Sequence, residues 1–189
     1  GQEGHGVSGL KFDRRKAVFS PEKMRTYRQG YHYFGSIKGG KTMEQEKNLQ
    51  LVKHGLRFLE STHAYSSDRE NTRFMVHLPN ESREETRAFL LAAEEEWKKE
   101  SPSFYEFAIL LGEEHIGAVS LYLNEERDTG ELGWILDKRY WGHGYACQAA
   151  ERVMSFGRDT LKITHFVAHC DSENAASRRV MEKLGMKRT

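Results

Sequence analysis

Short runs of apolar residues, separated by turn residues, occupy the second half of the chain. The segments 104–111 (FYEFAILL) and 115–123 (HIGAVSLYL) are rich in β-branched and aromatic residues, and the Gly-Glu-Glu between them is typical of a hairpin. The segments 131–136 (ELGWIL) and 164–170 (THFVAHC) have the same texture. We therefore expect four strands in this half.

Apolar residues three or four positions apart predict the helices between and around these strands. A helix over 82–97 begins with Ser and Glu at capping-box spacing and continues with one buried face. A second amphipathic helix follows the glycine-rich bend at 142–144, and a third over 174–184 is closed by Gly185. The resulting order of strand, strand, strand, helix, strand and helix is typical of a mixed α/β domain.

The first half of the chain has a weaker pattern. The segment 10–20 is a candidate strand. After Thr42 the spacing of four apolar residues predicts another helix with one buried stripe: Leu49, Val52, Leu56 and Leu59. We divide the chain into an N-terminal segment of uncertain placement, 1–42, and one domain over 43–189.

The bulk composition narrows the class of protein. With 189 residues, of which 38% are hydrophobic and 30% charged, the chain suits one soluble globular domain. A formal net charge of +1 gives no reason to expect a broad surface for nucleic acid or membrane, and no apolar run reaches the ~18 residues of a membrane helix. Two cysteines, Cys147 and Cys170, favour a reducing, cytoplasmic location.

Two glycine-rich stretches are candidate phosphate-binding loops. GSIKGGKT (35–42) fits the pattern G-x-x-x-x-G-K-[ST], which predicts a nucleotide-binding loop when a buried apolar strand precedes it. The preceding MRTYRQGYHYF is polar and rich in tyrosine, unlike such a strand. We therefore prefer a flexible glycine loop here and keep nucleotide binding as a third hypothesis.

The second stretch, DKRYWGHGYACQAA (137–150), has the better context. It follows a predicted strand and opens a predicted helix, so its two glycines can bring backbone amides close to an anion at the positive end of the helix. Lys138, Arg139 and His143 add donors and charge nearby. From these residues alone, the stretch is either a pyrophosphate cradle or a tight turn.

The motif Arg139-x-x-Gly142-x-Gly144 resembles the acetyl-CoA signature of the GNAT superfamily of N-acetyltransferases. The surrounding ELGWILDKRYWGHGYACQAAERVM and the later CDSENAASRRVMEKLGM are similar to the branch that contains the ribosomal-protein N-terminal acetyltransferases. The resemblance covers about residues 65–189. It implies a mixed, mostly antiparallel sheet, flanked by helices, in which the strands at 131–136 and 164–170 splay apart in a V.

The resemblance also implies how acetyl-CoA would bind. Backbone amides of 139–144 would hold the pyrophosphate, and the backbone at 134–136 would pair with the pantetheine arm, with the amide of Ile135 polarising the thioester carbonyl. Asn174 would bond the pantetheine arm, and Ser177 would give a proton to the leaving thiolate. The residues implied for the coenzyme are Trp134, Ile135, Leu136, Arg139, Tyr140, Trp141, Gly142, His143, Gly144, Tyr145, Ala146, Asn174 and Ser177.

Transfer to an amine also needs a base, because an amine attacks only when neutral and free amines have reference pKa values of ~8 to ~10.4. Glu131 matches the position where several superfamily members carry such a glutamate, and the competing interpretation is a surface carboxylate at a strand edge. Glu106 is the next candidate. Met181 stands where many members carry a tyrosine as the acid, so the acid would be Ser177, Tyr145 or solvent.

Other residues could indicate a covalent nucleophile, a metal site or substrate contacts, and we do not favour these interpretations. We interpret Cys170 as a small core residue rather than a nucleophile. His165 and His169 alternate onto one strand face, but a metal site needs more than two ligands, and we expect no metal. The tyrosines and histidine of GYHYFG (30–35) either line a substrate or pack, and we expect packing.

The sheet edge beside 164–170 is the largest departure from the family. The family continues with two antiparallel strands beyond the position of Thr189, and a bare edge would be an association liability. Three explanations are open: the two strands are absent, a partner chain supplies them, or the N-terminal segment replaces them. If the N-terminal segment does not replace them, it is a tag remnant or a first strand. Replacement would be a circular permutation, and a sheet that keeps residues 10–37 away from 164–170 would contradict it.

We expect a cytoplasmic N-acetyltransferase that moves acetyl from acetyl-CoA to a primary amine by direct attack in a ternary complex. The branch resemblance favours a protein N-terminal α-amine over a small molecule such as an aminoglycoside, a polyamine or an amino acid. From another class, the alternative is a coenzyme A-binding sensor or structural domain without turnover. We expect no nucleic acid or membrane partner, and a homodimer is compatible with the sequence.

Overall fold

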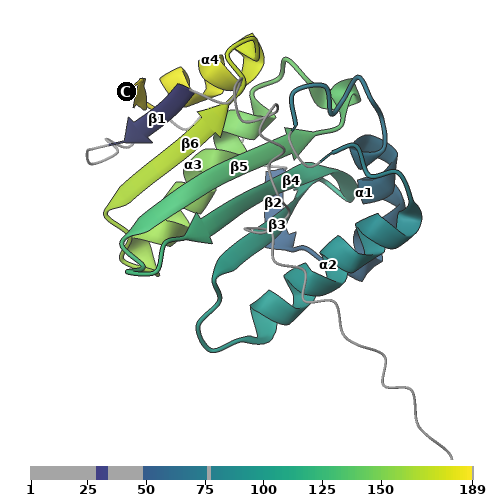
Figure 1. Cartoon of the computed structure of the whole chain (residues 1–189), viewed down its shortest axis with the longest axis horizontal. Helices are drawn as coiled ribbons and strands as arrows, with labels where there is room; N and C mark the ends of the chain where they lie inside the picture. Colours follow the sequence, from purple (N-terminus) through teal and green to yellow (C-terminus); the bar gives the residue numbers. More distant parts are fainter. Residues whose placement is uncertain (1–28, 34–48, 76–77, 189) are drawn as a thin grey trace, which may run out of the picture.

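The computed structural model describes residues 29–33, 49–75 and 78–188. Within them, one sheet holds seven strands in the order β2-β3-β4-β5-β6-β1-β7 (Figure 1). The strands are β1 (Gln29–Tyr33), β2 (Leu49–Lys53), β3 (Phe104–Leu111), β4 (Glu114–Leu123), β5 (Thr129–Leu136), β6 (His165–Cys170) and β7 (Lys187–Arg188). The helices are α1 (Leu59–Ser66), α2 (Arg83–Lys98), α3 (Tyr145–Asp159) and α4 (Ala175–Lys183), with short 3-10 turns η3 (Leu56–Phe58) and η4 (Lys138–Tyr140).

Neighbouring strands are antiparallel except β5 and β6, which are parallel and connected through α3. This arrangement confirms the predicted mixed, mostly antiparallel sheet. Helices α1 and α2 gather at the β2–β3 end of the sheet, whereas β1 and β7 lie at the other end (Figure 1). None of the helices in the described ranges is long and apolar enough to cross a membrane.

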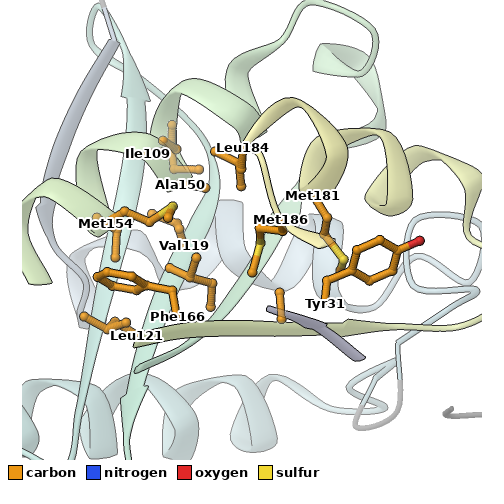
Figure 2. Close-up of a cluster of buried hydrophobic side chains, with 14 of the residues drawn as sticks. Tyr31, Ile109, Val119, Leu121, Ala150, Met154, Phe166, Met181, Leu184 and Met186 are labelled. Carbon is orange, nitrogen blue, oxygen red and sulfur yellow. The ribbon is translucent and has the colours of Figure 1, made fainter. Parts of the chain in front are cut away.

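Helix α3 covers one side of the sheet, here called the α3 face. Its Met154 lies in one buried cluster with Val119 of β4 and Phe166 of β6 (Figure 2). On β3, the ring of Tyr105 packs edge-on against Phe156 of α3, with ring centroids 5.2 Å apart. Because side chains alternate along a strand, the residues next to Tyr105 and Phe166 point to the opposite face. We call that side the α1 face, because α1 packs there against β4.

The helix predicted from Leu49, Val52, Leu56 and Leu59 is wrong at its start. Residues Leu49–Lys53 form β2, which pairs antiparallel with β3 from Leu49↔Leu111 to Lys53↔Phe107. Leu49 is buried and Gln50 exposed, as strand alternation requires. The spacing of these apolar residues is compatible with both a helix and a strand. The segment forms a strand because it pairs with the edge of β3. By contrast, α2 begins as predicted, where Ser82 Oγ accepts a hydrogen bond from Glu85 N at 3.2 Å.

An N-terminal strand occupies the edge beside β6. β1 pairs antiparallel with β6 from Gln29↔Cys170 to Tyr33↔Phe166, and β7 pairs with the outer side of β1. This is where the permutation hypothesis required a strand from residues 10–37. The candidate strand at 10–20 lies outside the described residues. Tyr31 is 2% exposed and lies with Met181 and Met186 in the core (Figure 2), so this tyrosine packs as expected.

Candidate active site between β5 and β6

The parallel strands β5 and β6 pair over only part of their length. Their register runs from Thr129↔His165 to Leu132↔Ala168 and stops there. β5 continues to Leu136 with β4 as its neighbour, where Leu136 stands opposite Gly117. The two strands therefore part after Leu132, and among the described strands none pairs with the β6-facing side of 133–136. This is the V-shaped splay predicted from the family resemblance.

The direction of the backbone decides which amides face the splay. Asp137 N donates to Ile116 O of β4 at 2.9 Å, so the Asp137 amide points to β4. Since successive amides of a strand point to opposite sides, the Ile135 amide also points to β4, and those of Trp134 and Leu136 point into the splay. The expected role of the Ile135 amide does not fit this geometry, and its neighbour Trp134 takes that place in the proposal below.

Beyond β5 the chain forms the glycine turn that the sequence singled out. Gly142 and Gly144 have φ of 82° and 81°, in the left-handed region, and a Cβ built on either meets nothing within 4 Å. Gly144 is the N-cap of α3 and provides no side-chain cap to the first amides of that helix. Open space, glycine backbone and a helix N-terminus fit a phosphate group held by amides.

The basic side chains of this turn are already paired with carboxylates. The Arg139 guanidinium contacts Asp137, with Nη2 to Oδ2 at 2.9 Å, and Lys138 Nζ lies 2.8 Å from both Asp68 and Glu70. These hydrogen bonds raise the pKa of Arg139 and Lys138, so both remain charged. Their charge is largely balanced locally, which leaves the backbone amides as the main anion donors of the turn.

The predicted coenzyme residues between Tyr140 and Ala146 lie in the same turn. Trp141 is 46% exposed, and its Nε1 donates to Leu136 O at 3.1 Å. The rings of His143 and Tyr145 stack with centroids 5.5 Å apart. Tyr140 lies in η4 and Ala146 in the first turn of α3, so the predicted residues 139–146 follow closely after β5 in the chain.

Helix α4 begins just beyond the end of β6, at the wide side of the splay. Asn174 is its N-cap, and its Oδ1 accepts from Ser177 N at 3.0 Å. This bond uses the carbonyl oxygen of Asn174 and orients its amide group away from the helix end. Ser177 is partly buried in the first turn. Met181 is 1% exposed in the core and cannot donate a proton.

The two candidate bases differ in their surroundings. Both lie on the α1 face, because Glu106 pairs with Ser120, and Tyr122, two residues further along β4, pairs with Glu131. Glu131 is exposed and its Oε1 lies 2.9 Å from Nδ1 of His169, at the start of the splay. Glu106 is buried near Tyr65 of α1. The pKa of Tyr65 is raised, mainly by the burial of Tyr65 itself and also by the charge of Glu106. Glu131 is the one that an acceptor can reach.

Two residues at the splay were not predicted in these roles. Asn71, in the segment after α1, donates from Nδ2 to Leu136 O at 3.0 Å and fixes the end of β5. His169 was considered only as half of a metal pair with His165, and no group of three metal-ligating side chains occurs in the described part of the chain. The nucleotide-loop pattern GSIKGGKT (35–42) lies outside the described residues.

Comparison with known proteins identifies the family of this chain. Residues 49–187 match the family described as "Acetyltransferase (GNAT) domain". The chain belongs to the GNAT acetyltransferase family. It is 27% identical over 146 residues to the uncharacterized N-acetyltransferase YnaD of Bacillus subtilis, an alignment that covers 75% of this chain and 81% of YnaD. GNAT acetyltransferase activity, predicted from the sequence, is therefore supported.

Solved GNAT structures share the fold. A GNAT-family acetyltransferase from Bacillus anthracis superposes with a TM-score of 0.65 at 29% identity and covers 75% of this chain and 81% of its own. The RimL ribosomal L7/L12 α-N-protein acetyltransferase gives a TM-score of 0.65 at 20% identity, covering 79% of this chain and 84% of its own. RimL has also been solved in complex with coenzyme A.

Proposed function

We propose that this GNAT domain transfers acetyl from acetyl-CoA to a primary amine by direct attack. The observation that carries the proposal is the splay that exposes the backbone of 134–136 next to the glycine turn and the N-terminus of α3. One continuous stretch of chain thus offers strand-like amides to a peptide-like arm and helix-end amides to a pyrophosphate. A covalent enzyme intermediate is not part of the proposal, because burial raises the pKa of Cys170 and keeps it a thiol.

The same geometry assigns a part to each segment. Amides of 139–144 and of the first turn of α3 hold the pyrophosphate, and the side-chain amide of Asn174 holds the pantetheine arm. The Trp134 amide points into the splay just beyond the last β5–β6 pair, so it donates to the thioester oxygen as negative charge develops there. When bound, acetyl-CoA supplies the activated acetyl group.

The chemistry of the α1 face favours an acceptor with a single amine. Around the splay this face carries the carboxylate of Glu131 together with His169 and His32, and with Lys187 on the strand beyond β1. A polyamine binds best to several carboxylates in a row, whereas the α-amine of a peptide needs one. We therefore retain the N-terminal α-amine of a protein or peptide as the preferred acceptor, and a small-molecule amine as the second candidate.

Replacing Ser177 by alanine is expected to lower kcat by about 10²-fold, because a positioned proton donor contributes at least that factor when a thiolate leaves. Binding of acetyl-CoA should persist, since the bond that orders this turn runs from the backbone of Ser177 to Asn174. Steady-state kinetics measure the effect, and the exposed Ser172→Ala is the matched control. Equal kcat in both variants would indicate that the leaving thiolate receives its proton from solvent and not from Ser177.

The proposed function is tested in two steps. Acetyl-CoA should raise the melting temperature of the protein while ATP with Mg²⁺ should not, because only a ligand of the native state stabilises it. Thiol release is then measured with acetyl-CoA and a panel of N-terminal peptides, spermidine and an aminoglycoside. Stabilisation by acetyl-CoA without thiol release from any amine would indicate the alternative, a coenzyme A-binding sensor. Stabilisation by ATP alone would indicate a nucleotide-binding loop.

A further inference from the structure

A carboxylate and an imidazole meet on the α1 face at the start of the splay. Glu131 of β5 and His169 of β6 approach to 2.9 Å between Oε1 and Nδ1. Glu131 lies within the paired stretch, opposite Val167, and His169 is the first residue of β6 beyond the last pair, Leu132↔Ala168. The side-chain contact therefore runs diagonally across the place where the two strands begin to part.

The ring of His169 is partly exposed at the edge of the gap between β5 and β6. His169 is the first residue of β6 beyond the last pair with β5, and the residue across the gap is Gly133. Gly133 has no side chain, and a Cβ there would come within 2.8 Å of Ser120 Oγ on the α1 face. The His169 side chain is 38% exposed. The gap is thus bordered by the imidazole of His169 on one side and by the Gly133 backbone, with the Ser120 hydroxyl over it, on the other.

The hydrogen bond to Glu131 fixes the orientation and the tautomer of the ring. With Nδ1–H donating to the carboxylate, the lone pair of neutral His169 lies on Nε2. The pKa of His169 is raised above its usual value, mainly by this hydrogen bond to Glu131. Burial opposes the rise, and the charge of the carboxylate adds to it. A base of raised pKa matches an ammonium proton better than a free imidazole does.

We propose that His169 is the group that removes the proton from the acceptor amine, and that Glu131 is the positioning residue that holds it. The inference deepens the proposed function and rests on it. Nε2 of His169 takes one proton from the ammonium, and the freed amine nitrogen forms a bond to the acetyl carbon while the C–S bond breaks. The second nitrogen proton goes to the leaving thiolate through Ser177 or water, and His169 returns its proton to solvent.

Three charged or titratable groups of β6, β1 and β7 lie on the same side of the sheet as this pair. His165 lies on the strand of His169, His32 on β1 opposite Val167, and Lys187 on β7 opposite His32. His32 Nδ1 and His165 Nε2 are 3.2 Å apart. Desolvation, followed by the charges of His165 and His169, lowers the pKa of His32, which keeps that ring neutral beside the pair.

The pH dependence of kcat tests the proposal. In the wild-type protein kcat should rise as pH passes the pKa of His169, which lies above ~6.5, because only the neutral ring accepts a proton. His169→Gln should lower kcat by about 10²-fold and abolish this rise. Glu131→Gln keeps an acceptor for Nδ1–H but removes the charge, so the rise should persist at a lower pH.

The controls separate the ring from the substrate and from the fold. Two amines of different pKa are compared, since a rise that moves with the amine belongs to the acceptor. His165→Gln removes a histidine from the same strand and face and should keep the wild-type profile, and the thermal shift with acetyl-CoA should be unchanged in every variant. Imidazole NMR signals report the pKa of His169 directly, and Glu131→Gln should lower it.

If kcat of His169→Gln still rises with pH as in the wild type, the proposal is overturned. If the rise of kcat is lost in Glu131→Gln but kept in His169→Gln, the carboxylate of Glu131 is the base. These outcomes leave the proposed function intact, because transfer is still observed. Acetyl-CoA binding without thiol release in the wild-type protein would overturn the proposed function, and the proton transfer with it.

Discussion

Replacing Gly144 by alanine is expected to raise the KM for acetyl-CoA by about 10- to 100-fold, the equivalent of one lost charge-assisted hydrogen bond of ~1.5–3 kcal/mol. Gly144 has φ of 81° and caps α3, so its conformation sets where the first amides of the helix point. A left-handed alanine costs about 1–2 kcal/mol, which the turn relieves by rotating its backbone. The amides then leave the positions that a pyrophosphate requires.

Gly112 is a matched control for this substitution. It also has a left-handed φ, 62°, and a Cβ there meets nothing within 4 Å, but it belongs to the β3–β4 hairpin and not to the glycine turn or the N-terminus of α3. Gly112→Ala and Gly144→Ala should therefore lose similar stability in urea unfolding. Only Gly144→Ala should lose acetyl-CoA binding in calorimetric titration. Equal affinity in both variants would show that the turn does not hold the coenzyme.

Elements whose signals are local were predictable from the sequence. β3 and β4 were expected at 104–111 and 115–123 and occur at Phe104–Leu111 and Glu114–Leu123, because alternation, aromatic content and the glycine turn agree there. The glycine turn at 142–144 was found for the same reason, since its strand, glycines and helix are consecutive in the chain. In such stretches the residues that determine the structure are neighbours in the sequence.

Features that depend on pairing between distant segments were not predictable. β2 was mistaken for a helix because its partner, β3, lies more than fifty residues further along. Likewise, the contact of Glu131 with His169 spans 38 positions and that of Asn71 with Leu136 spans 65. The direction of the Ile135 amide needed the register of β4 and β5. A single sequence specifies side-chain types, and sheet register decides which of them meet.

The second large effect is expected at β1. Tyr31→Ala should lower the free energy of unfolding by about 3–5 kcal/mol, as removal of a buried aromatic ring does. The ring is 2% exposed in the core with Met181 and Met186, in a strand bordered by β6 and β7. Tyr31→Phe keeps the ring and should retain most of the stability. Chemical denaturation measures both, and equal stability of Tyr31→Ala and wild type would show that β1 contributes little to the core.

The connection of β1 to β2 should matter far less than the strand itself. Four strands separate β1 from β2 in the sheet, a span of about 24 Å at ~4.8 Å per strand, whereas the end of β7 lies beside β1, with Arg188 opposite Tyr31. The permutation hypothesis therefore predicts that a chain opened between residues 48 and 49, with Thr189 joined to Gly1 by a short linker, folds and binds acetyl-CoA. Tyr31→Ala should destabilise this rearranged chain as much as the original. If the rearranged chain fails to fold while Tyr31→Phe folds, the segment 34–48 is required and β1 is not a displaced C-terminal strand.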